Sequence, residues 1–431
     1  MIQILDAAKT PLSEILARRE DTRDVSDAVA GIIADVRQNG DAALRRYAKE
    51  FDHADLDALE VPPTLLDRAL EELSPDLRSI MEEAAKNIRD FHRRQERDSF
   101  FVSEKPGILL GQKVLPIEKV GVYIPGGSAP LFSTVLMNCI PAKIAGCPET
   151  VMVSPPSCNG DISPAILAAA RIAGVDRVFR CGGAQAVAAL AYGTETVPKV
   201  DKIVGPGNAF VAEAKRQVFG LVGIDMLAGP SEILVIATGG SDPIHVAADL
   251  LSQAEHDACA SALLVTDSPE LAQAVCLELE RQLESLPRQE TARASLEANG
   301  KIILTRDIHE AVSIANALAP EHLELHVENP FDYLSQVKNA GSIFLGRSSP
   351  ESLGDYFAGT NHTLPTSGTA RFSSPLSVDD FVKKSQFIYY TAPALEQASE
   401  KIAALARLEG LEGHARSVLV RTTQVKKERQ S

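Results

Sequence analysis

The chain has 431 residues, of which 45% are hydrophobic, and its 43 basic and 58 acidic side chains give a formal net charge of −15. This length is too great for one ordinary hydrophobic core, so at least two globular lobes are expected. The acidic balance argues against a nucleic-acid partner, because binding to phosphates requires clustered Lys and Arg. No run approaches the roughly 18 consecutive apolar residues of a membrane span, which argues against a membrane protein.

The N-terminal segment and the cysteines indicate the compartment. The first twenty residues mix acids and bases with short apolar groups, and they lack the apolar stretch and the cleavage pattern of a signal peptide. Six cysteines are scattered along the chain without CxxC spacing, as is typical of reduced thiols. We therefore expect a cytoplasmic protein without disulfides.

Residues 1–97 are predicted to be almost entirely helical. Apolar residues recur at helical spacing between Val25 and Val36, and a further segment follows from Gly40 to Phe51. Ser74 and Pro75 open a long helix that is expected to run to about Arg97, because serine accepts a backbone N–H at a helix start and proline fits the first turn.

From about Phe100 the pattern changes to that of strands, and four strand–helix units follow. Their strands end in VYIPGG, VMVSPP, VFRCGG and KIVGPG. Such units predict a parallel sheet, in which ligands bind at the carboxyl ends of the strands. The glycines expected at that edge are Gly126, Gly127, Gly182, Gly183, Gly205 and Gly207.

A second α/β lobe is predicted after AGPSE and is expected to run to about Gly346, with strands EILVIA, ALLVT, KIILT, HLELHV and SIFLG. The repeated pattern suggests that the two lobes are distant copies of each other. Beyond Asp380 the chain is predicted to be helical and to form an arm. The expected fold class is α/β, with two Rossmann-like lobes of parallel sheet, a helical N-terminal segment and a C-terminal helical arm.

Among the nine histidines, His256 has a suggestive partner. Gln253 and His256 stand three residues apart in a predicted helix, so both side chains share one face and can bind one ion. An ordinary polar helix face is the commoner explanation for such a pair. Five histidines in helix-surface or strand surroundings are set aside: His53, His92, His245, His309 and His326.

Glu321 and His322 follow a proline at a predicted helix-to-strand turn, where side chains can face a cleft. A carboxylate beside an imidazole offers two bases of different intrinsic pKa, which suits a reaction with two proton removals. Asp355 and His362 lie in a polar, Gly- and Thr-rich stretch that is typical of an active-site loop or of a plain surface loop. Glu409 and His414 near the end fit a helix surface equally well.

Together and in this order, these segments resemble the histidinol dehydrogenase family. The resemblance covers nine segments: VGVYIPGGSAPLFSTVLM, GGAQAVAALAYGT, VGPGNAFVAEAKR, DMLAGPSEILVIA, DLLSQAEHD, APEHLEL, AGSIFLG, LGDYFAGTNHTLPT and RLEGLEGHARSV. Any one of them is a weak signal, whereas a chance match of all nine in order is negligible. The resemblance implies a zinc-dependent, two-step oxidation of L-histidinol through bound L-histidinal to L-histidine, with reduction of two NAD, at the end of histidine biosynthesis.

The resemblance also implies the site. One Zn2+ per subunit would be bound by Gln253, His256, Asp355 and His414, a nitrogen and oxygen set without thiolate that leaves the ion open to substrate. Glu321 and His322 would be catalytic. The substrate contacts would be Ser231, Gln253, His256, His322, Asp355, His362, Glu409 and His414.

The family pattern further implies NAD contacts at Tyr123, Gln185 and Asn208. No G-x-G-x-x-G follows the first strand of either lobe, so the cofactor expectation depends on the resemblance alone. The family also implies a homodimer with shared active sites, in which the arm bearing Glu409 and His414 reaches the partner subunit.

In the implied chemistry, His322 takes the alcohol proton in the first oxidation, and Glu321 activates water before the second. The expected segments are 1–20, an N-terminal helical segment; 21–122, the first part of lobe 1; 123–231, lobe 2 on the NAD-binding side; 232–375, the second part of lobe 1 with the metal and catalytic residues; and 376–431, the arm.

Three alternatives remain open at this stage. Cys139 or Cys147 could bind the aldehyde covalently, although a buried structural thiol is the commoner explanation in a small-residue helix. A zinc hydrolase in which Glu321 activates metal-bound water would turn over without NAD. A metal-stabilised binding protein would unfold when zinc is removed.

Overall fold

The computed structural model describes residues 2–18, 24–126 and 130–428, with side chains described as far as residue 422. Gly127, one of the glycines expected at a ligand-binding edge, lies outside the described residues. The chain forms two compact units. Unit 1 comprises Met1–Glu96 and Ile117–Phe381, and unit 2 comprises Arg97–Pro116 and Val382–Ser431.

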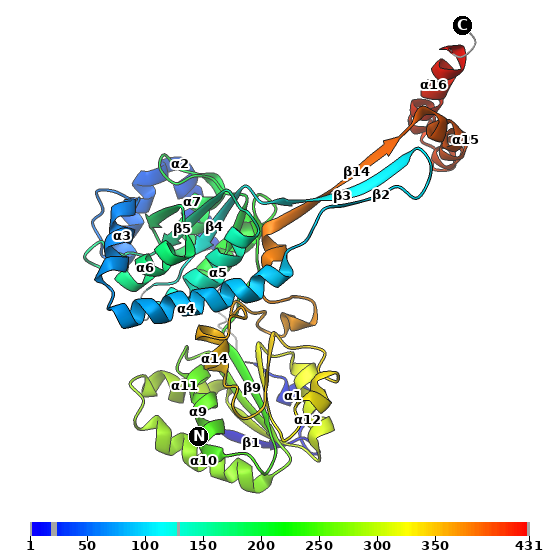
Figure 1. Ribbon diagram of the computed structural model, residues 1–431. Helices are drawn as coiled ribbons and strands as arrows, with labels where there is room; N and C mark the ends of the chain where they lie inside the picture. Colours follow the sequence, from blue (N-terminus) through cyan, green and yellow to red (C-terminus); the bar gives the residue numbers. More distant parts are fainter. Residues whose placement is uncertain (1, 19–23, 127–129, 429–431) are drawn as a thin grey trace. The chain divides into compact units, whose positions relative to one another are not determined.

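The first sheet of unit 1 has five parallel strands in the order β6-β5-β4-β7-β8. Two of them, β4 and β5, are labelled in Figure 1. The predicted parallel sheet of four strand–helix units is therefore confirmed. Its strands are β4 (Lys119–Tyr123), β5 (Glu149–Ser154), β6 (Arg177–Arg180), β7 (Lys202–Val204) and β8 (Gly223–Ile224). The helices between them are α5 (Phe132–Ile144), α6 (Pro164–Ala173), α7 (Gly183–Tyr192) and α8 (Ala209–Val218).

The second sheet has six parallel strands in the order β1-β11-β10-β9-β12-β13. Its strands are β1 (Gln3–Asp6), β9 (Glu232–Ala237), β10 (Ser261–Thr266), β11 (Lys301–Leu304), β12 (His322–His326) and β13 (Ser342–Leu345). The main helices are α9 (Pro243–Ala254), α10 (Pro269–Leu283), α11 (Gln289–Asn299) and α12 (Ile308–Leu318). Apart from β1, both sheets have the same order: third, second, first, fourth and fifth strand of their lobe. This shared order agrees with the idea that the lobes are distant copies.

Apolar runs explain why these strands lie inside the lobes. Every residue of β9 and β10 is buried, as expected for parallel strands that helices cover on both faces. The two faces of the six-stranded sheet pack into separate hydrophobic clusters. Ile233 and Val235 face α9 and α10, whereas Leu234 and Ile236 face α12.

The N-terminal helices are α1 (Leu12–Ile15), α2 (Ser26–Phe51), α3 (Pro63–Glu72) and α4 (Pro75–His92), with a 3-10 turn η1 (Arg93–Gln95). Ser74 caps α4 as predicted, because its hydroxyl accepts the N–H of Leu77. Residues 3–6 correct the helical expectation, since β1 pairs with β11 at the edge of the six-stranded sheet. Its sequence, QILD, is too short to show a strand pattern.

Helices α2, α3 and α4 cover the five-stranded sheet. α2 packs on α7 and α8, α3 packs on α6, and α4 packs on α5. Residues 21–122 were expected to share a lobe with residues 232–375. The packing differs, because the apolar faces of α2, α3 and α4 join the cores around β4, β5 and β6. The other expected segment boundaries remain predictions. Unit 1 is completed by α13 (Phe331–Leu334), α14 (Glu351–Tyr356), η2 (Thr369–Arg371) and η3 (Val378–Phe381).

Unit 2 combines an antiparallel sheet with two helices. β2 (Phe100–Val102), β3 (Ile108–Pro116) and β14 (Val382–Tyr390) pair in the order β14-β3-β2, and α15 (Ala392–Leu408) packs on α16 (Glu412–Glu428). The helical arm is confirmed, but the expectation of helix directly after Asp380 was wrong for residues 382–390. Their mixture of Lys, Ser and Gln conceals a strand that is mostly exposed on both faces.

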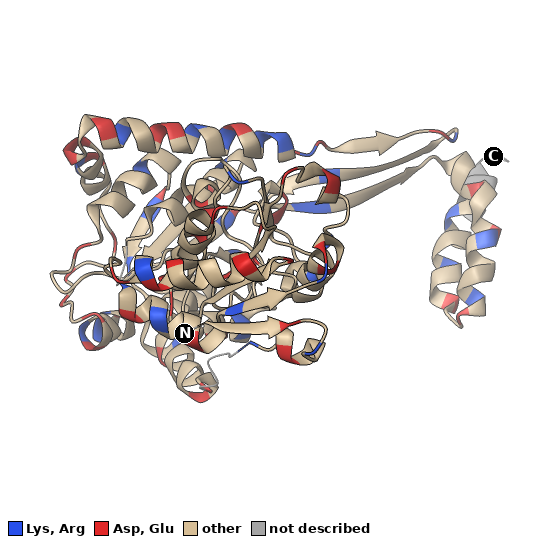
Figure 2. Cartoon of the chain, turned by 90° about the horizontal axis from the view of Figure 1, so that it is seen from below, with Lys and Arg blue, Asp and Glu red and all other residues tan. Residues whose placement is uncertain are grey.

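The surface carries charges of both signs. Figure 2 shows acidic and basic residues interspersed along the outer helices. Many of them form ion pairs four residues apart, such as Arg68 with Glu72 and Lys86 with Asp90. Within the part of the chain that the structure describes, no helix is long and apolar enough to cross a membrane.

Candidate active site

Glu321 and His322 lie at the amino end of β12, and the backbone of one residue at the amino end of the neighbouring strand β9 holds both. Glu232, the first residue of β9, donates its N–H to Oε2 of Glu321 at 2.8 Å. The carbonyl oxygen of Glu232 lies 3.0 Å from Nδ1 of His322. His322 begins β12, which pairs with β9 in parallel. The sheet register therefore brings the predicted catalytic pair to one point.

The hydrogen bond to Glu232 determines the tautomer of His322. A carbonyl oxygen only accepts, so Nδ1 carries the proton and Nε2 of the neutral ring has a free lone pair. Nε2 is buried without a hydrogen-bond partner. It lies 3.9 Å from Oε1 of Glu351 and 3.9 Å from Oδ1 of Asp355. The ring can therefore take a proton at Nε2, and the resulting cation would face two carboxyl groups.

A set of candidate metal ligands lies beside His322. One ligand atom from each of His256, Glu351 and Asp355 lies within 4.8 Å of the others. Gln253 lies one turn before His256 and is fully buried, and neither its amide oxygen nor its amide nitrogen has a hydrogen-bond partner. Leaving a buried amide unpaired costs about 1–3 kcal/mol. A cation bound by the amide oxygen would remove part of this cost, so these residues fit a divalent ion with nitrogen and oxygen ligands.

Glu351 is a functional candidate that the sequence interpretation missed. Its Oε2 accepts a hydrogen bond from the hydroxyl of Ser252 at 2.7 Å, and its N–H donates to Oε1 of Glu324 at 2.7 Å. The side chain is almost completely buried. The spacing from Asp355 could have revealed it, because residues four apart on a helix share one face.

β12 presents a buried polar row to α9. His322, Glu324 and His326 alternate with Leu323 and Leu325, which pack into the opposite core. His326 was set aside in the sequence interpretation, yet the structure buries it with Nε2 3.2 Å from Glu324 and 3.5 Å from Asp249. The HLELH alternation in a buried parallel strand is the signal that could have identified this row, since such strands are otherwise apolar. His92, also set aside, is likewise fully buried.

Burial controls the electrostatics of the site. It raises the pKa of Glu321 well above its usual range, and the charges of Glu232 and Glu351 add to the effect. Burial, followed by the charge of Glu351, raises the pKa of Asp355 to about 7. In the opposite direction, burial and then the charge of His322 lower the pKa of His362 to about 4. A bound cation would stabilise the ionised carboxylates and neutral imidazoles of this cluster.

The stretch around His362 is a fixed segment and not a plain surface loop. His362 is close enough to His322 and His256 for their charges to affect it, and its Nε2 has no hydrogen-bond partner. The amide of Asn361 donates to the carbonyl of Met137 at 2.7 Å, which fastens the segment to α5. Ser231 directly precedes Glu232 and is partly exposed beside the catalytic pair.

The predicted residues of the arm belong to unit 2. Glu409 follows the last residue of α15, and His414 lies in the first turn of α16. Both side chains are exposed. Their roles as substrate contact and metal ligand remain predictions.

The three predicted NAD contacts lie at the carboxyl edge of the five-stranded sheet. Tyr123 ends β4, and its hydroxyl accepts the N–H of Gly183 at 3.0 Å. Gln185 is buried in the first turn of α7. Asn208 caps α8, since its Oδ1 accepts the N–H groups of Phe210 and Val211. The amide nitrogen of Asn208 remains on an exposed side chain.

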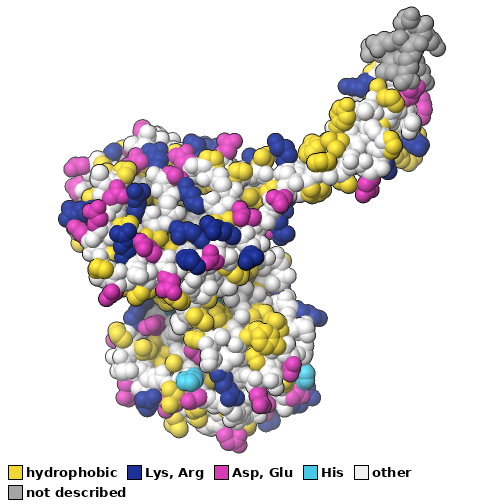
Figure 3. All heavy atoms as spheres, in the orientation of Figure 1, with side chains coloured by type: hydrophobic (Ala, Val, Ile, Leu, Met, Phe, Trp, Pro, Cys, Tyr) yellow, Lys and Arg dark blue, Asp and Glu magenta, His cyan; other side chains and the backbone are white. Residues whose placement is uncertain are grey.

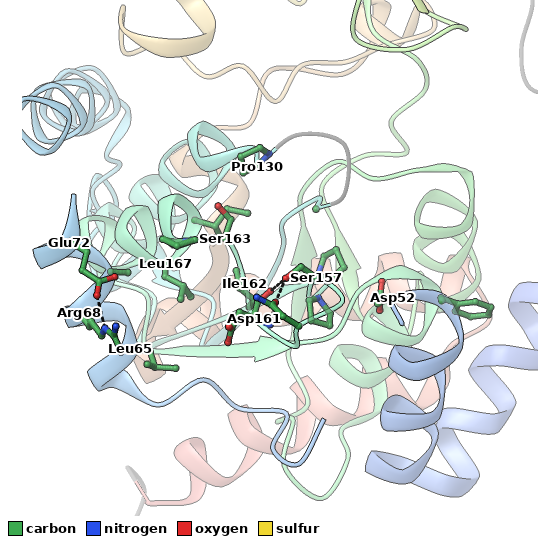
Figure 4. Close-up of a pocket in the computed structure, with 18 residues that line it drawn as sticks. Asp52, Leu65, Arg68, Glu72, Pro130, Ser157, Asp161, Ile162, Ser163 and Leu167 are labelled. Carbon is green, nitrogen blue, oxygen red and sulfur yellow. Dashed lines mark hydrogen bonds and ion pairs between the residues drawn. The ribbon is translucent and has the colours of Figure 1, made fainter. Parts of the chain in front are cut away.

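A cavity of about 720 Å³ opens at the same edge (Figure 4). The segments that follow β4 and β5 line it, together with α3, α6 and the end of α2, and its residues include Asp52, Gly126, Pro155, Ser157 and Asp161. None of the predicted catalytic or metal-binding residues lines this cavity. Burial raises the pKa of Asp52 on its wall to about 6.

The cysteines fit structural roles. All six are free. Cys139 and Cys147 lie in the core that covers β4 and β5. Burial raises the pKa of Cys139 to about 12 and that of Cys147 to about 11. A thiol held neutral in this way is a poor nucleophile, which disfavours covalent catalysis by either residue.

Comparison with known proteins agrees with this geometry. Residues 16–422 match the histidinol dehydrogenase family. The chain belongs to that family. It is 53% identical over 411 residues to the histidinol dehydrogenase of Geobacter sulfurreducens, covering 94% of this chain and 96% of that protein. It is 54% identical over 400 residues to that of Geobacillus kaustophilus, covering 93% and 94%.

A solved structure of the same family has a very similar fold. The crystal structure of histidinol dehydrogenase from Elizabethkingia anophelis matches with a TM-score of 0.93 at 40% identity, and the match covers 99% of both chains. The resemblance that the nine sequence segments carry is thus confirmed, and the chain is an oxidoreductase with a role in histidine biosynthesis. A zinc hydrolase or a binding protein without catalysis is not favoured.

Proposed function

We propose that the chain oxidises L-histidinol through bound L-histidinal to L-histidine, with one zinc ion per subunit and two NAD per substrate. The observation that carries the proposal is the state of His322. Its Nδ1 is fixed by the carbonyl of Glu232, and its unpartnered Nε2 faces the cluster of candidate ligands. This is the arrangement that a base for an alcohol proton requires.

Gln253, His256 and Asp355 would hold the zinc ion, with His414 of a second subunit as the fourth ligand. The buried, unpartnered amide of Gln253 and the nearby imidazole and carboxyl groups support this assignment. When bound, the zinc ion would fix the imidazole and amine of the substrate, and NAD would accept a hydride in each oxidation. Ser231, His362 and Glu409 would add polar contacts to the same substrate.

The proton steps follow from the two buried side chains. His322 takes the alcohol proton at Nε2 while the carbon–hydrogen bond breaks, and Glu351 stabilises the imidazolium from 3.9 Å. Glu321 then removes a proton from water, which adds to the aldehyde and gives the hydrate for the second oxidation. Its raised pKa makes the ionised carboxylate a stronger base.

NAD would bind at the carboxyl edge between β4 and β7. There the order of the five-stranded sheet changes direction, and in open α/β sheets nucleotides bind at such switch points. Tyr123 ends β4, Asn208 lies four residues beyond the end of β7, and Gln185 lies in the first turn of α7. The 720 Å³ cavity lies at the same edge and offers room for part of a dinucleotide.

The apolar surface of unit 2 supports the homodimer. Figure 3 shows hydrophobic side chains gathered along this unit. Phe101, Ile388, Leu405 and Leu408 are 66% to 85% exposed. A second copy that covered this surface would bury large apolar side chains, and it would bring Glu409 and His414 to a neighbouring active site. We also place the enzyme in the cytoplasm, with no nucleic-acid or membrane partner.

The test is to mix the purified protein with L-histidinol and NAD and to follow the absorbance of reduced nicotinamide. Two equivalents per histidinol are expected, with loss of activity after chelation and recovery on adding zinc. One equivalent, or turnover that does not depend on the metal, contradicts the proposal. Hydrolytic turnover without NAD would instead support a zinc hydrolase that uses Glu321.

A further inference from the structure

The loop between β7 and α8 is held by a buried ion pair to which the proposed reaction gives no role. Lys215 of α8 pairs with Asp225, which directly follows β8, and the two side chains are only 2% and 1% exposed. Together they bind both peptide groups of one loop residue. The N–H of Gly205 donates to Oδ2 of Asp225 at 2.7 Å, and Nζ of Lys215 donates to the carbonyl of Gly205 at 3.0 Å.

Gly205 is where this loop meets the end of β4. Its φ of 114° lies in the region that favours glycine, and a side chain there would overlap the backbone carbonyl of Tyr123. Three residues later Asn208 begins α8 as its cap. The ion pair therefore fixes the short stretch between two of the expected NAD contacts.

Fold stability alone does not account for such a pair. Removing two charges from water is costly, and an apolar pair of similar volume is often as stable or more stable. Here the charged groups do what an apolar pair cannot, because they hold the two peptide groups of Gly205 in one orientation. A surface held in its binding conformation before the ligand arrives binds more tightly, since less order has to be gained on binding.

We propose that Lys215 and Asp225 are positioning residues for the dinucleotide, fixing the Gly205–Asn208 loop against Tyr123. This inference rests on the proposed function, because it assumes that NAD binds at this edge. Lys215 does not act as a free positive charge for the cofactor phosphates, since Asp225 neutralises it and both groups are buried. The pair acts through the backbone of Gly205.

The test uses the zinc-loaded, full-length enzyme and the variant Lys215→Met with Asp225→Leu, which replaces the charges with apolar side chains. Loss of loop order is expected to raise the KM for NAD roughly tenfold or more, while the kcat at saturating NAD and the KM for histidinol stay within about twofold. Calorimetric titration with NAD in the absence of substrate should show the same loss of affinity.

Lys202→Met is the matched control. Lys202 lies at the opposite end of β7 and pairs with Asp380, 3.3 Å away, so its loss removes an ion pair on the same strand without touching the loop. Its NAD affinity should remain that of the wild type. Asp225→Asn keeps the side-chain shape and serves if the double variant does not fold, with a smaller rise in the KM for NAD expected.

Two results would overturn the inference. One is an unchanged NAD affinity in a folded Lys215 and Asp225 variant, and the other is an equal rise in the KM values for NAD and histidinol. Either would make the pair purely structural. Failure of the wild-type enzyme to reduce NAD with histidinol would contradict the proposed function itself, which separates the two claims.

Discussion

At the scale of single residues, the backbone of Glu232 does the positioning that a third catalytic side chain performs in many enzymes. Its N–H and its carbonyl hold Glu321 and His322, while its own carboxylate pairs with Arg18 at 2.7 Å. A strand backbone has fewer soft dihedrals than a long side chain, so the pair is fixed with little loss of side-chain entropy. The two bases are thereby held side by side without competing for one proton.

Glu321→Gln tests whether Glu321 and His322 act as bases in different steps of the reaction. The substitution keeps the size of the side chain and leaves an amide oxygen to accept the N–H of Glu232. In the proposed mechanism only the hydration step needs the carboxylate, so the variant should release one reduced NAD per histidinol instead of two, with a slowed second oxidation. Product analysis with added L-histidinal checks this. His322→Asn should lose both oxidations, and two equivalents from Glu321→Gln at the wild-type rate would remove Glu321 from the mechanism.

In the proposed zinc site, Asp355 would make zinc binding sensitive to pH. Burial raises its pKa to about 7, so below that pH a proton occupies the carboxylate and the metal must displace it. Zinc affinity should therefore fall by roughly tenfold per unit as the pH drops from 7 to 5. Competition with a chelator across this range measures the slope. Asp355→Asn should bind zinc weakly, with a flatter pH dependence, and an equally steep slope in that variant would exclude Asp355 as the cause.

At the scale of elements, the two sheets use opposite edges. The expected NAD contacts lie at the carboxyl ends of β4 and β7, as the general rule for parallel sheets predicts. The proposed catalytic pair lies at the amino end of β12, beside the amino end of β9, and these are the corresponding strands of the other sheet. Gln253 and His256 reach that edge because α9 runs back from the carboxyl end of β9, so its last turn returns to the amino end.

This arrangement explains what the sequence could and could not predict. Buried apolar runs and glycine-rich strand ends are local signals, and they correctly predicted strands β4 to β7, strands β9 to β13 and the sheet class. The convergence of His256, Glu321 and Asp355 is long-range, and spacing alone left each of them ambiguous without the resemblance of the nine segments to a known family. Glu351 was missed because its four-residue spacing from Asp355 indicates a shared helix face but does not distinguish a buried acid from a solvated one. β14 was missed because both of its faces are largely exposed.

Gly40 is the point where helix α2 changes direction. Its φ of 50° and ψ of −130° interrupt the helix, and a side chain there would meet the carboxylate of Glu195. That carboxylate accepts the N–H of Asp41 at 2.7 Å and so caps the second half of the helix. Gly40→Ala should lower the free energy of unfolding by about 2 kcal/mol or more. Chemical denaturation measures this, with Gly31→Ala as a control at an open helical position.

Asp52 ends α2 at a site that disfavours its charge. Burial raises its pKa to about 6 from an ordinary 3.8, and a carboxylate at a helix C-terminus is further disfavoured by the helix dipole. The folded state therefore holds the proton more tightly, and the stability that this gives is complete below pH 4 and is lost as the pH rises through 6. Asp52→Asn should stabilise the protein by about 1–2 kcal/mol at pH 8 and by almost nothing at pH 4. Thermal unfolding of the wild type and the variant at both pH values measures this difference in stability. A variant that is also more stable at pH 4 would indicate another cause.

At the scale of the whole molecule, the proposed mechanism requires two chains. Unit 1 supplies His322, Glu321 and three of the four proposed zinc ligands, whereas Glu409 and His414 lie in unit 2. If the arm serves the active site of its own chain, a defect in unit 1 or in the arm inactivates that chain, and no partner chain can restore its activity. If it serves the neighbouring chain, both defects of a mixed dimer fall in one site and the other site is intact.

Mixing two inactive variants distinguishes these cases. His322→Asn and His414→Asn should each lack activity as homodimers. After subunit exchange half of the dimers are mixed, and each mixed dimer has one site with both defects and one site with neither, so activity should return to about a quarter of the wild-type value. Exchange is followed by tagging one variant and isolating the mixed dimer, which should bind one tight zinc ion. Complete inactivity of an isolated mixed dimer would show that His322 and His414 of the same chain form one site. As a control, Leu408→Asp places a charge on the exposed surface of unit 2. This variant should prevent dimerisation and so abolish the rescue.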